Sequence, residues 1–138
     1  MKAPVSLYVI AKILSPISSP SDALYDELSD IDIDDPDELR VLIQKFIVPH
    51  FEKYDYESQQ KIRNSLQYFV CADDPKLKRI FPMFHIPFDE PASMVDFLST
   101  LWEELFQQKL SCQIDLSIFE KVEDAEFANT LNRKTIGG

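Results

Sequence analysis

Four residues of this 138-residue chain are of the types that bind zinc or form a nucleophilic Cys–His pair: His50, Cys71, His85 and Cys112. Structural zinc sites hold their ligands in pairs about two to five residues apart, whereas these four are scattered along the chain. Catalytic Cys and His residues can come from distant positions, but no local motif supports that chemistry. We therefore expect no metal and no cofactor, and we interpret both cysteines as buried free thiols of a reducing compartment.

Three aspartates, Asp30, Asp32 and Asp34, have the spacing that opens a calcium-binding loop. Such a loop needs a glycine at its sixth position for a sharp turn, and a glutamate at its twelfth that binds the ion through both oxygens. This chain has Asp35 and Val41 at those positions. The sequence therefore predicts no calcium site of this type.

Phosphate-binding loops require glycine, because their backbone must approach the ligand closely. The chain contains two glycines, Gly137 and Gly138, so the P-loop and dinucleotide-binding motifs are excluded. A basic cluster of Lys76, Lys78 and Arg79 has the charge to contact a phosphate. We interpret that cluster instead as a solvated face or as a set of partners for neighbouring aspartates.

The strongest chemical signal is a run of acids from Asp22 to Glu38. This segment holds nine of the 24 acidic residues, and no Lys or Arg occurs between Lys12 and Arg40. Nearly all of the net charge of −10 therefore lies in one short segment. Closely spaced carboxylates repel one another and create a field that steers cationic partners. They disfavour nucleic acid and anionic membranes as partners, since both require Lys and Arg to meet phosphates.

Apolar periodicity predicts the elements that position these residues. We expect a mainly α fold, a compact single-domain helical bundle of five to seven helices over residues 1–138, with a frayed tail at 134–138. No apolar run reaches the roughly 18 residues of a membrane span. Helix starts are predicted from capping residues and prolines at Ser19-Pro20, Asp35-Pro36, Asp55, Asp74-Pro75 and Glu90-Pro91.

Two stretches leave their secondary structure open. Residues 5–14 fit a buried strand or a short helix. Residues 112–118 alternate strictly, as a half-buried strand does, and a helix that begins at Asp115 is the competing interpretation. A small β element is the most that we expect from these two stretches. Within the acidic segment, we expect a short helix near residues 20–28 and a linker that turns Ile31 and Ile33 inward.

The wide apolar face of residues 91–108 predicts the central helix of the core. It includes Met94, Leu98 and Leu101 together with Trp102. We expect Trp102 to be buried against the apolar stripe of residues 39–47.

A small, acidic, glycine-poor domain without catalytic motifs resembles a bacterial immunity protein or antitoxin. The resemblance rests on the acidic run and on the size of the chain. It implies a cytoplasmic, non-enzymatic inhibitor that neutralises a basic protein toxin, a nuclease, by covering its active-site surface with carboxylates. The partner-binding residues that it implies are Asp26, Asp30, Asp32, Asp34, Asp35 and Asp37, with Tyr25 and Tyr54 as aromatic anchors.

Two other classes of function stay open from the sequence. One is an adaptor that binds a peptide or helix in an apolar groove near residues 81–88. The other is an enzyme that uses dispersed residues such as His85 and Cys71.

Overall fold

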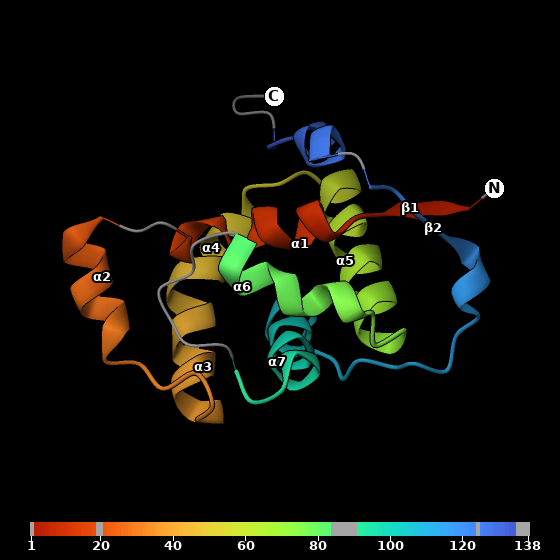
Figure 1. Ribbon diagram of the computed structural model, residues 1–138. Coiled ribbons are helices and arrows are strands. Elements are labelled where there is room, and N and C mark those ends of the chain that lie inside the picture. The colour runs from red at the N-terminus through yellow and green to blue at the C-terminus, as the bar shows by residue number, and fades with distance from the viewer. Residues whose placement is uncertain (1, 19–20, 84–90, 124, 135–138) are drawn as a thin grey trace.

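In the computed structural model, residues 2–18, 21–83, 91–123 and 125–134 are described, and helices dominate them. Figure 1 shows the helices gathered around α1, with α2 at one edge and a short strand pair at the other. This arrangement confirms the mainly α fold. The α-helices are α1 (Leu7–Ile13), α2 (Asp22–Ser29), α3 (Pro36–Leu42), α4 (Val48–Glu52), α5 (Tyr56–Cys71), α6 (Ile80–Met83) and α7 (Met94–Phe106).

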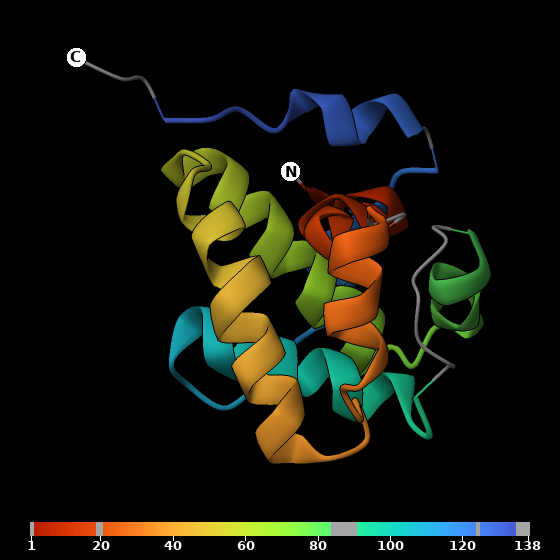
Figure 2. The same ribbon diagram turned by 90° about the vertical axis from the view of Figure 1, so that its left-hand side faces the viewer.

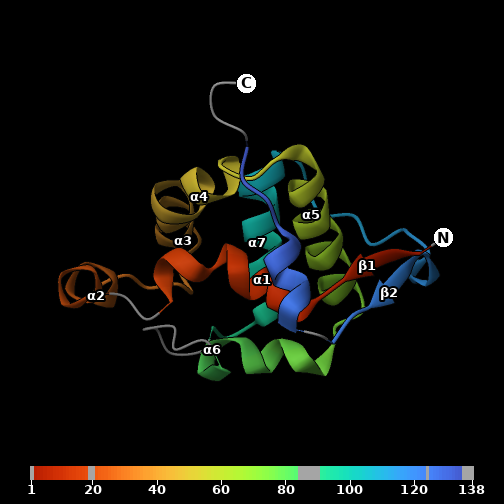
Figure 3. The same ribbon diagram turned by 90° about the horizontal axis from the view of Figure 1, so that it is seen from above.

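Shorter helical turns complete the chain between and after these helices. A π-helical segment at Ile43–Ile47 joins α3 to α4. The 3-10 turns are Ser15–Ile17, Pro75–Arg79, Leu116–Ile118 and Ala125–Thr130. Figure 3 shows the last of these turns lying across α1.

The stretch of residues 5–14 forms a helix rather than a buried strand. Ser6 caps it, because its hydroxyl oxygen accepts a hydrogen bond of 3.2 Å from the backbone N–H of Tyr8. The backbone N–H of Ser6 in turn donates to the hydroxyl of Ser65 on α5, at 3.1 Å. Only the residues before this cap are extended, as strand β1 (Ala3–Val5).

Of the two alternatives for residues 112–118, the strand does not form. Asp115 instead caps the turn Leu116–Ile118, since its carboxylate accepts a 2.9 Å hydrogen bond from the N–H of Ser117. The helical alternative is thus correct for one turn. Strand β2 (Phe119–Lys121) follows and pairs in parallel with β1. Because β1 offers three residues for pairing, it leaves the alternating residues before Phe119 without a partner strand.

Three of the predicted helix starts are confirmed by hydrogen bonds from backbone N–H groups to carboxylates. Asp35 accepts at 2.9 Å, Asp55 at 2.8 Å and Asp74 at 2.9 Å. The other two predicted starts, Ser19-Pro20 and Glu90-Pro91, include residues outside the described part of the chain, and the described helices begin further along, after hydroxyl caps. Ser21 caps α2, and Ser93 caps α7 three residues after the predicted Glu90.

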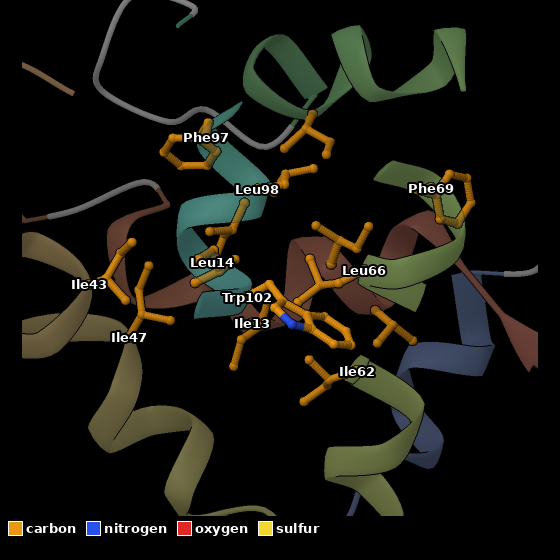
Figure 4. Packing of buried hydrophobic residues seen from close by; sticks show 14 of the residues in the cluster. Ile13, Leu14, Ile43, Ile47, Ile62, Leu66, Phe69, Phe97, Leu98 and Trp102 are labelled. Carbon is orange, nitrogen blue, oxygen red and sulfur yellow. The ribbon is translucent and has the colours of Figure 1, made fainter. Parts of the chain in front are cut away.

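The hydrophobic core is built from buried residues of α1, α5 and α7 together with the π-helical segment. Trp102 is 1% exposed, and Figure 4 shows its indole between the side chains of α5 and α7, beside Ile62 and Leu66. The helix α7 also packs against α3 and the π-helical segment. Trp102 is therefore a core residue, as predicted, while its contact with the stripe of residues 39–47 stays a prediction. The guanidinium of Arg63 covers one face of the indole, 4.7 Å from the ring centroid.

The interpretation of the cysteines as free thiols is wrong, because Cys71 and Cys112 form a disulfide. Cys71 ends α5, and Cys112 lies in the loop after α7. The side-chain amide of Gln67 donates to the carbonyl of Ser111 at 3.1 Å, which holds that loop against α5. The two thiols meet because α5 and α7 pack together, a long-range contact that sequence spacing does not reveal.

The tail predicted to fray at residues 134–138 is tied down at its first residue. The N–H of Lys134 donates to the carbonyl of Lys53 at 2.8 Å, and the N–H of Asp55 donates to the carbonyl of Asn132 at 2.9 Å. Residues 135–138 lie outside the described part of the chain. Within the described part, no helix has the length and apolar character to cross a membrane.

Candidate partner-binding surface

The acidic run of residues 22–38 forms one edge of the molecule, which we call the acidic face. It consists of α2, the linker at residues 30–35 and the start of α3. Figure 2 shows α2 running beside α3, and Figure 3 places α2 outside the main group of helices. On α2 the side chain of Leu28 is buried, while the acidic side chains are exposed.

Hydrogen bonds within the linker fix its backbone. The carboxylate of Asp32 accepts from the N–H of Asp34 at 3.0 Å, and the carboxylate of Asp35 caps α3. Ile33 is 7% exposed and joins the core, while Ile31 packs partly against it. The prediction that the isoleucines turn inward is confirmed for Ile33 and in part for Ile31, and the hydrogen bonds hold the carboxylates around them in a defined arrangement.

Asp34 has a long-range partner. Its carboxylate accepts a 2.9 Å hydrogen bond from the backbone N–H of Ala92, just before the cap of α7. This contact ties the acidic linker to the central helix. Asp34 therefore has a structural role in addition to the partner-binding role predicted for it.

The acidic face has two basic neighbours in space, of which Lys45 comes from outside the acidic run and Arg40 follows it directly. Lys45 of the π-helical segment forms an ion pair with Glu27 on α2. Arg40 lies 3.7 Å from Asp37, although it also reaches Glu104 on α7, at 3.5 Å. These pairs are exposed, so each contributes little stability, about 0–1 kcal/mol.

The remaining carboxylates leave the face strongly negative. Asp22, Asp26, Asp30 and Glu38 are exposed, and no ion pair joins them to another described residue. Of the aspartates predicted to bind a partner, all but Asp35 are exposed, and Asp35 is partly buried. The caps and internal bonds of the linker occupy one oxygen each of three of these aspartates, Asp32, Asp34 and Asp35.

Of the two predicted aromatic anchors, the structure leaves one on this face. Tyr25 on α2 is 48% exposed. Tyr54 is 3% exposed, so its interpretation as a surface anchor is wrong. The residue pairs with Arg133 in an isolated antiparallel bridge and packs edge-on against His50, with ring centroids 5.1 Å apart. The C-terminal segment around Arg133 folds back over Tyr54. The residues next to Tyr54 in the sequence do not indicate this long-range contact.

His50 lies at the centre of a polar cluster that resembles a nucleophilic pair. Its Nε2 atom is 3.3 Å from the hydroxyl of Ser15, 3.3 Å from that of Tyr54 and 3.2 Å from the carbonyl of Lys12. A carbonyl only accepts hydrogen bonds, so we assign the proton to Nε2. That nitrogen then has no lone pair to activate Ser15, and the cluster holds α1 against α4 instead.

Among the described residues, no group of three or more His, Cys, Asp and Glu side chains is arranged to hold a metal ion. Cys71 is bonded to Cys112, so in this state it offers no thiolate as a ligand or nucleophile. His85 lies outside the described residues. The described residues therefore give no support for a metal site at Asp30, Asp32 and Asp34.

The predicted apolar groove near residues 81–88 begins inside the core. Phe81 is 3% exposed and packs against Phe97, with ring centroids 5.5 Å apart. Residues 84–88 of the predicted groove lie outside the described part of the chain. Phe81, the first residue of the predicted groove, is therefore buried and not available to a peptide at the surface.

One member of the basic cluster, Lys76, has a carboxylate partner just after β2. Lys76 pairs with Glu123, and Lys121 pairs with Asp74 at 2.8 Å. With Arg79, these lysines border a pocket of about 210 Å³. Lys78 and Arg79 are exposed, as expected of a solvated face, whereas Asp74 forms its ion pair with Lys121 of the distant strand β2 and not with a base of this cluster.

Sequence reasoning missed an apolar notch inside the acidic face. Ile31, Val41 and the stems of Asp37 and Glu38 line a shallow hollow of about 260 Å³. The signal was present in the sequence, because Val41 stands outside the buried stripe of α3, which includes Leu39 and Leu42. An apolar residue on the polar side of a helix is the mark that could have pointed to this hollow.

Comparison of the chain with protein-family models, with curated proteins and with solved structures finds no match.

Proposed function

We propose that this protein is a non-enzymatic inhibitor of the bacterial immunity or antitoxin type. Its acidic face binds a basic protein toxin, a nuclease, and covers the surface that would otherwise contact nucleic acid. The observation that carries this proposal is the set of exposed carboxylates at Asp22, Asp26, Asp30 and Glu38, for which the described residues supply no ion pair.

The ordered backbone of the linker supports a role in partner binding, beyond a role in keeping the protein in solution. Ordering a flexible segment on association costs free energy, and a segment that is already ordered avoids most of that cost. The capping bond of Asp35, the contact of Asp34 with Ala92 and the burial of Ile33 order the linker in the free protein. Its carboxylates are therefore presented in one arrangement, as a complementary surface requires.

Inhibition would follow from charge and coverage. Carboxylates that meet Lys and Arg side chains take the place of phosphates and form charge-assisted hydrogen bonds, which are stronger than neutral ones. Pairs that stay exposed add about 0–1 kcal/mol each. The affinity then depends on the carboxylates that lose water at the centre of the contact.

The proposed function implies a cytoplasmic protein. The disulfide between Cys71 and Cys112 is not expected in that compartment. Disulfides persist mainly in oxidising compartments. In a reducing cytoplasm, Cys71 and Cys112 would be free thiols. The acidic face lies apart from this bond along the chain, so the proposed contact does not depend on the oxidation state of the cysteines.

The proposal is tested by removing charge from the acidic face without touching its internal hydrogen bonds. The test variant combines Asp26→Asn, Asp30→Asn and Glu38→Gln. The control makes the same change of charge at exposed residues elsewhere, with Glu52→Gln, Glu57→Gln and Glu120→Gln. Each variant is co-expressed with the polypeptide encoded immediately upstream of its gene, and its association rate with that polypeptide is measured at low and high salt.

The acidic-face variant should associate about tenfold more slowly at low salt, with a weaker dependence on salt, and should protect cells less. The control variant should behave like the unmodified protein. Equal protection and equal association rates for the two variants would contradict the proposal.

A further inference from the structure

The apolar notch of Ile31 and Val41 lies within the acidic face, where the charges would be expected to favour polar residues. Val41 is 64% exposed, although it lies on a helix whose other apolar residues, Leu39 and Leu42, are buried. Single exposed aliphatic residues are common on protein surfaces. This one differs because it shares a hollow of about 260 Å³ with a second apolar side chain.

Two acids form the rim of the notch. Asp37 and Glu38 line it directly, and Asp30 precedes Ile31 in the chain. The side chain of Asp37 is 94% exposed, and its ion pair with Arg40 is shared with Glu104. Any group that enters the notch must therefore pass negative charge that the protein itself neutralises only in part.

We infer that the notch receives an aliphatic side chain from a protein segment in which lysines or arginines flank that side chain. The inference rests on the proposed function and specifies the chemistry of the contact. Charge complementarity selects this occupant: an anionic lipid surface or a nucleic acid would be repelled by the rim, and a neutral apolar segment would leave the carboxylates desolvated without partners.

The two parts of the contact act at different stages of binding. Charges on the rim speed the encounter, and their effect weakens as salt is added. The aliphatic side chain loses water only after docking, so it slows dissociation instead. An apolar residue buried at the centre of a charged rim is the arrangement that concentrates binding energy in an interface.

Two synthetic lysine-rich peptides of equal length and charge test the inference. One carries a central leucine and the other a central serine. Each is titrated against the unmodified protein, against Val41→Ser, and against Ile118→Ser, which alters an exposed apolar residue outside the acidic face (51% exposed). Thermal melting of both variants establishes that they remain folded.

The leucine peptide should bind the unmodified protein and the Ile118→Ser variant about fivefold more tightly than the serine peptide does. This advantage should vanish with Val41→Ser, while the salt dependence of both peptides stays the same. Equal binding of the two peptides to the unmodified protein, or an advantage that survives Val41→Ser, would overturn the inference. So would the failure of both peptides to bind.

The outcome is separable from that of the proposed function. Equal but salt-sensitive binding of both peptides overturns the notch and leaves the charge-based contact standing. A leucine advantage that depends on Val41 supports the notch, even if co-expression with the neighbouring polypeptide gives no protection.

Discussion

Asp74 and Lys121 form an ion pair, with the carboxylate Oδ2 2.8 Å from the lysine Nζ, that joins the turn Pro75–Arg79 to strand β2. The other oxygen of Asp74 caps that turn, accepting a 2.9 Å hydrogen bond from the N–H of Lys76. Burial of this carboxyl raises its pKa, but the hydrogen bonds and the two lysine charges outweigh that effect. The pKa of Asp74 therefore lies below its ordinary value of 3.8.

Replacing Asp74 with Asn should destabilise the protein by about 1–3 kcal/mol, because the ammonium of Lys121 loses its partner while the cap is partly kept. The depressed pKa means that the carboxylate stabilises the fold fully above pH 3.8. That contribution is lost as the pH falls through the pKa of the folded state. Urea unfolding of both proteins over a pH series should show their stabilities converging in acid. A gap that stays constant in acid would contradict this account.

His50 should make the protein less stable as the pH falls below neutrality. Burial lowers the pKa of His50 below 6.5, and the charges of Arg133, Lys53 and Lys12 lower it further, against the opposing effect of its bond to the Lys12 carbonyl. The unfolded chain therefore binds a proton at higher pH than the folded protein does. Stability is lost between pH 6.5 and the lower pKa of the folded state.

The measurement for His50 is the melting temperature between pH 7 and pH 5. The unmodified protein should lose more of its melting temperature over this range than a His50→Gln variant does. Parallel pH profiles for the two proteins would show that His50 has no such role.

Reducing the disulfide should lower the stability without changing the helical content at low temperature. The bond closes a loop between residues that are 41 positions apart, for which chain entropy accounts for about 4 kcal/mol. A Cys71→Ser, Cys112→Ser variant should unfold at a correspondingly lower denaturant concentration. Thiol titration of the unmodified protein under denaturing conditions checks the premise, and two reactive thiols would contradict it.

Trp102 should be among the most costly positions to truncate. Its side chain is 1% exposed and packs against Phe106, with ring centroids 4.6 Å apart. Trp102→Ala should cost about 3–5 kcal/mol. Tyr56, which is 76% exposed, provides a control, and Tyr56→Ala should cost less than about 0.5 kcal/mol. Chemical denaturation of both variants gives the comparison, and similar losses would place Trp102 outside the core.

The sequence predicted the parts of the fold that depend on neighbouring residues. Asp35, Asp55 and Asp74 cap their helices because a short side chain reaches N–H groups a few positions ahead. The starts of α2 and α7 were misplaced because Ser21 and Ser93 offer competing caps. Local patterns place a helix start within a few residues. Which of the neighbouring candidate residues caps the helix then sets its first residue.

Long-range contacts account for the larger errors. Tyr54 was expected at the surface, and Cys71 was expected as a free thiol. Their surroundings are completed by Arg133 and Cys112, which arrive from distant parts of the chain. The spacing of residues near Tyr54 or near Cys71 in the sequence does not indicate these distant partners.

The candidate surface divides in the same way. The concentration of charge and the inward turn of Ile33 follow from the sequence, since alternation of acidic and apolar residues fixes which side chains face water. The partners of Glu27 and Asp34 cannot be predicted from the sequence. Lys45 and Ala92 reach them only through the packing of α3 and α7.

The parallel pairing of β1 with β2 has a consequence for synthesis on the ribosome. The partner of Ala3 is Phe119, about 116 positions later, so β1 waits for most of the chain to be made. At about 5–20 residues per second, that delay is roughly 6–23 seconds. The helices between the strands emerge during this time and can pack first, so the sheet closes on a scaffold that is already assembled. Until then, the edge of β1 is open to other nascent chains.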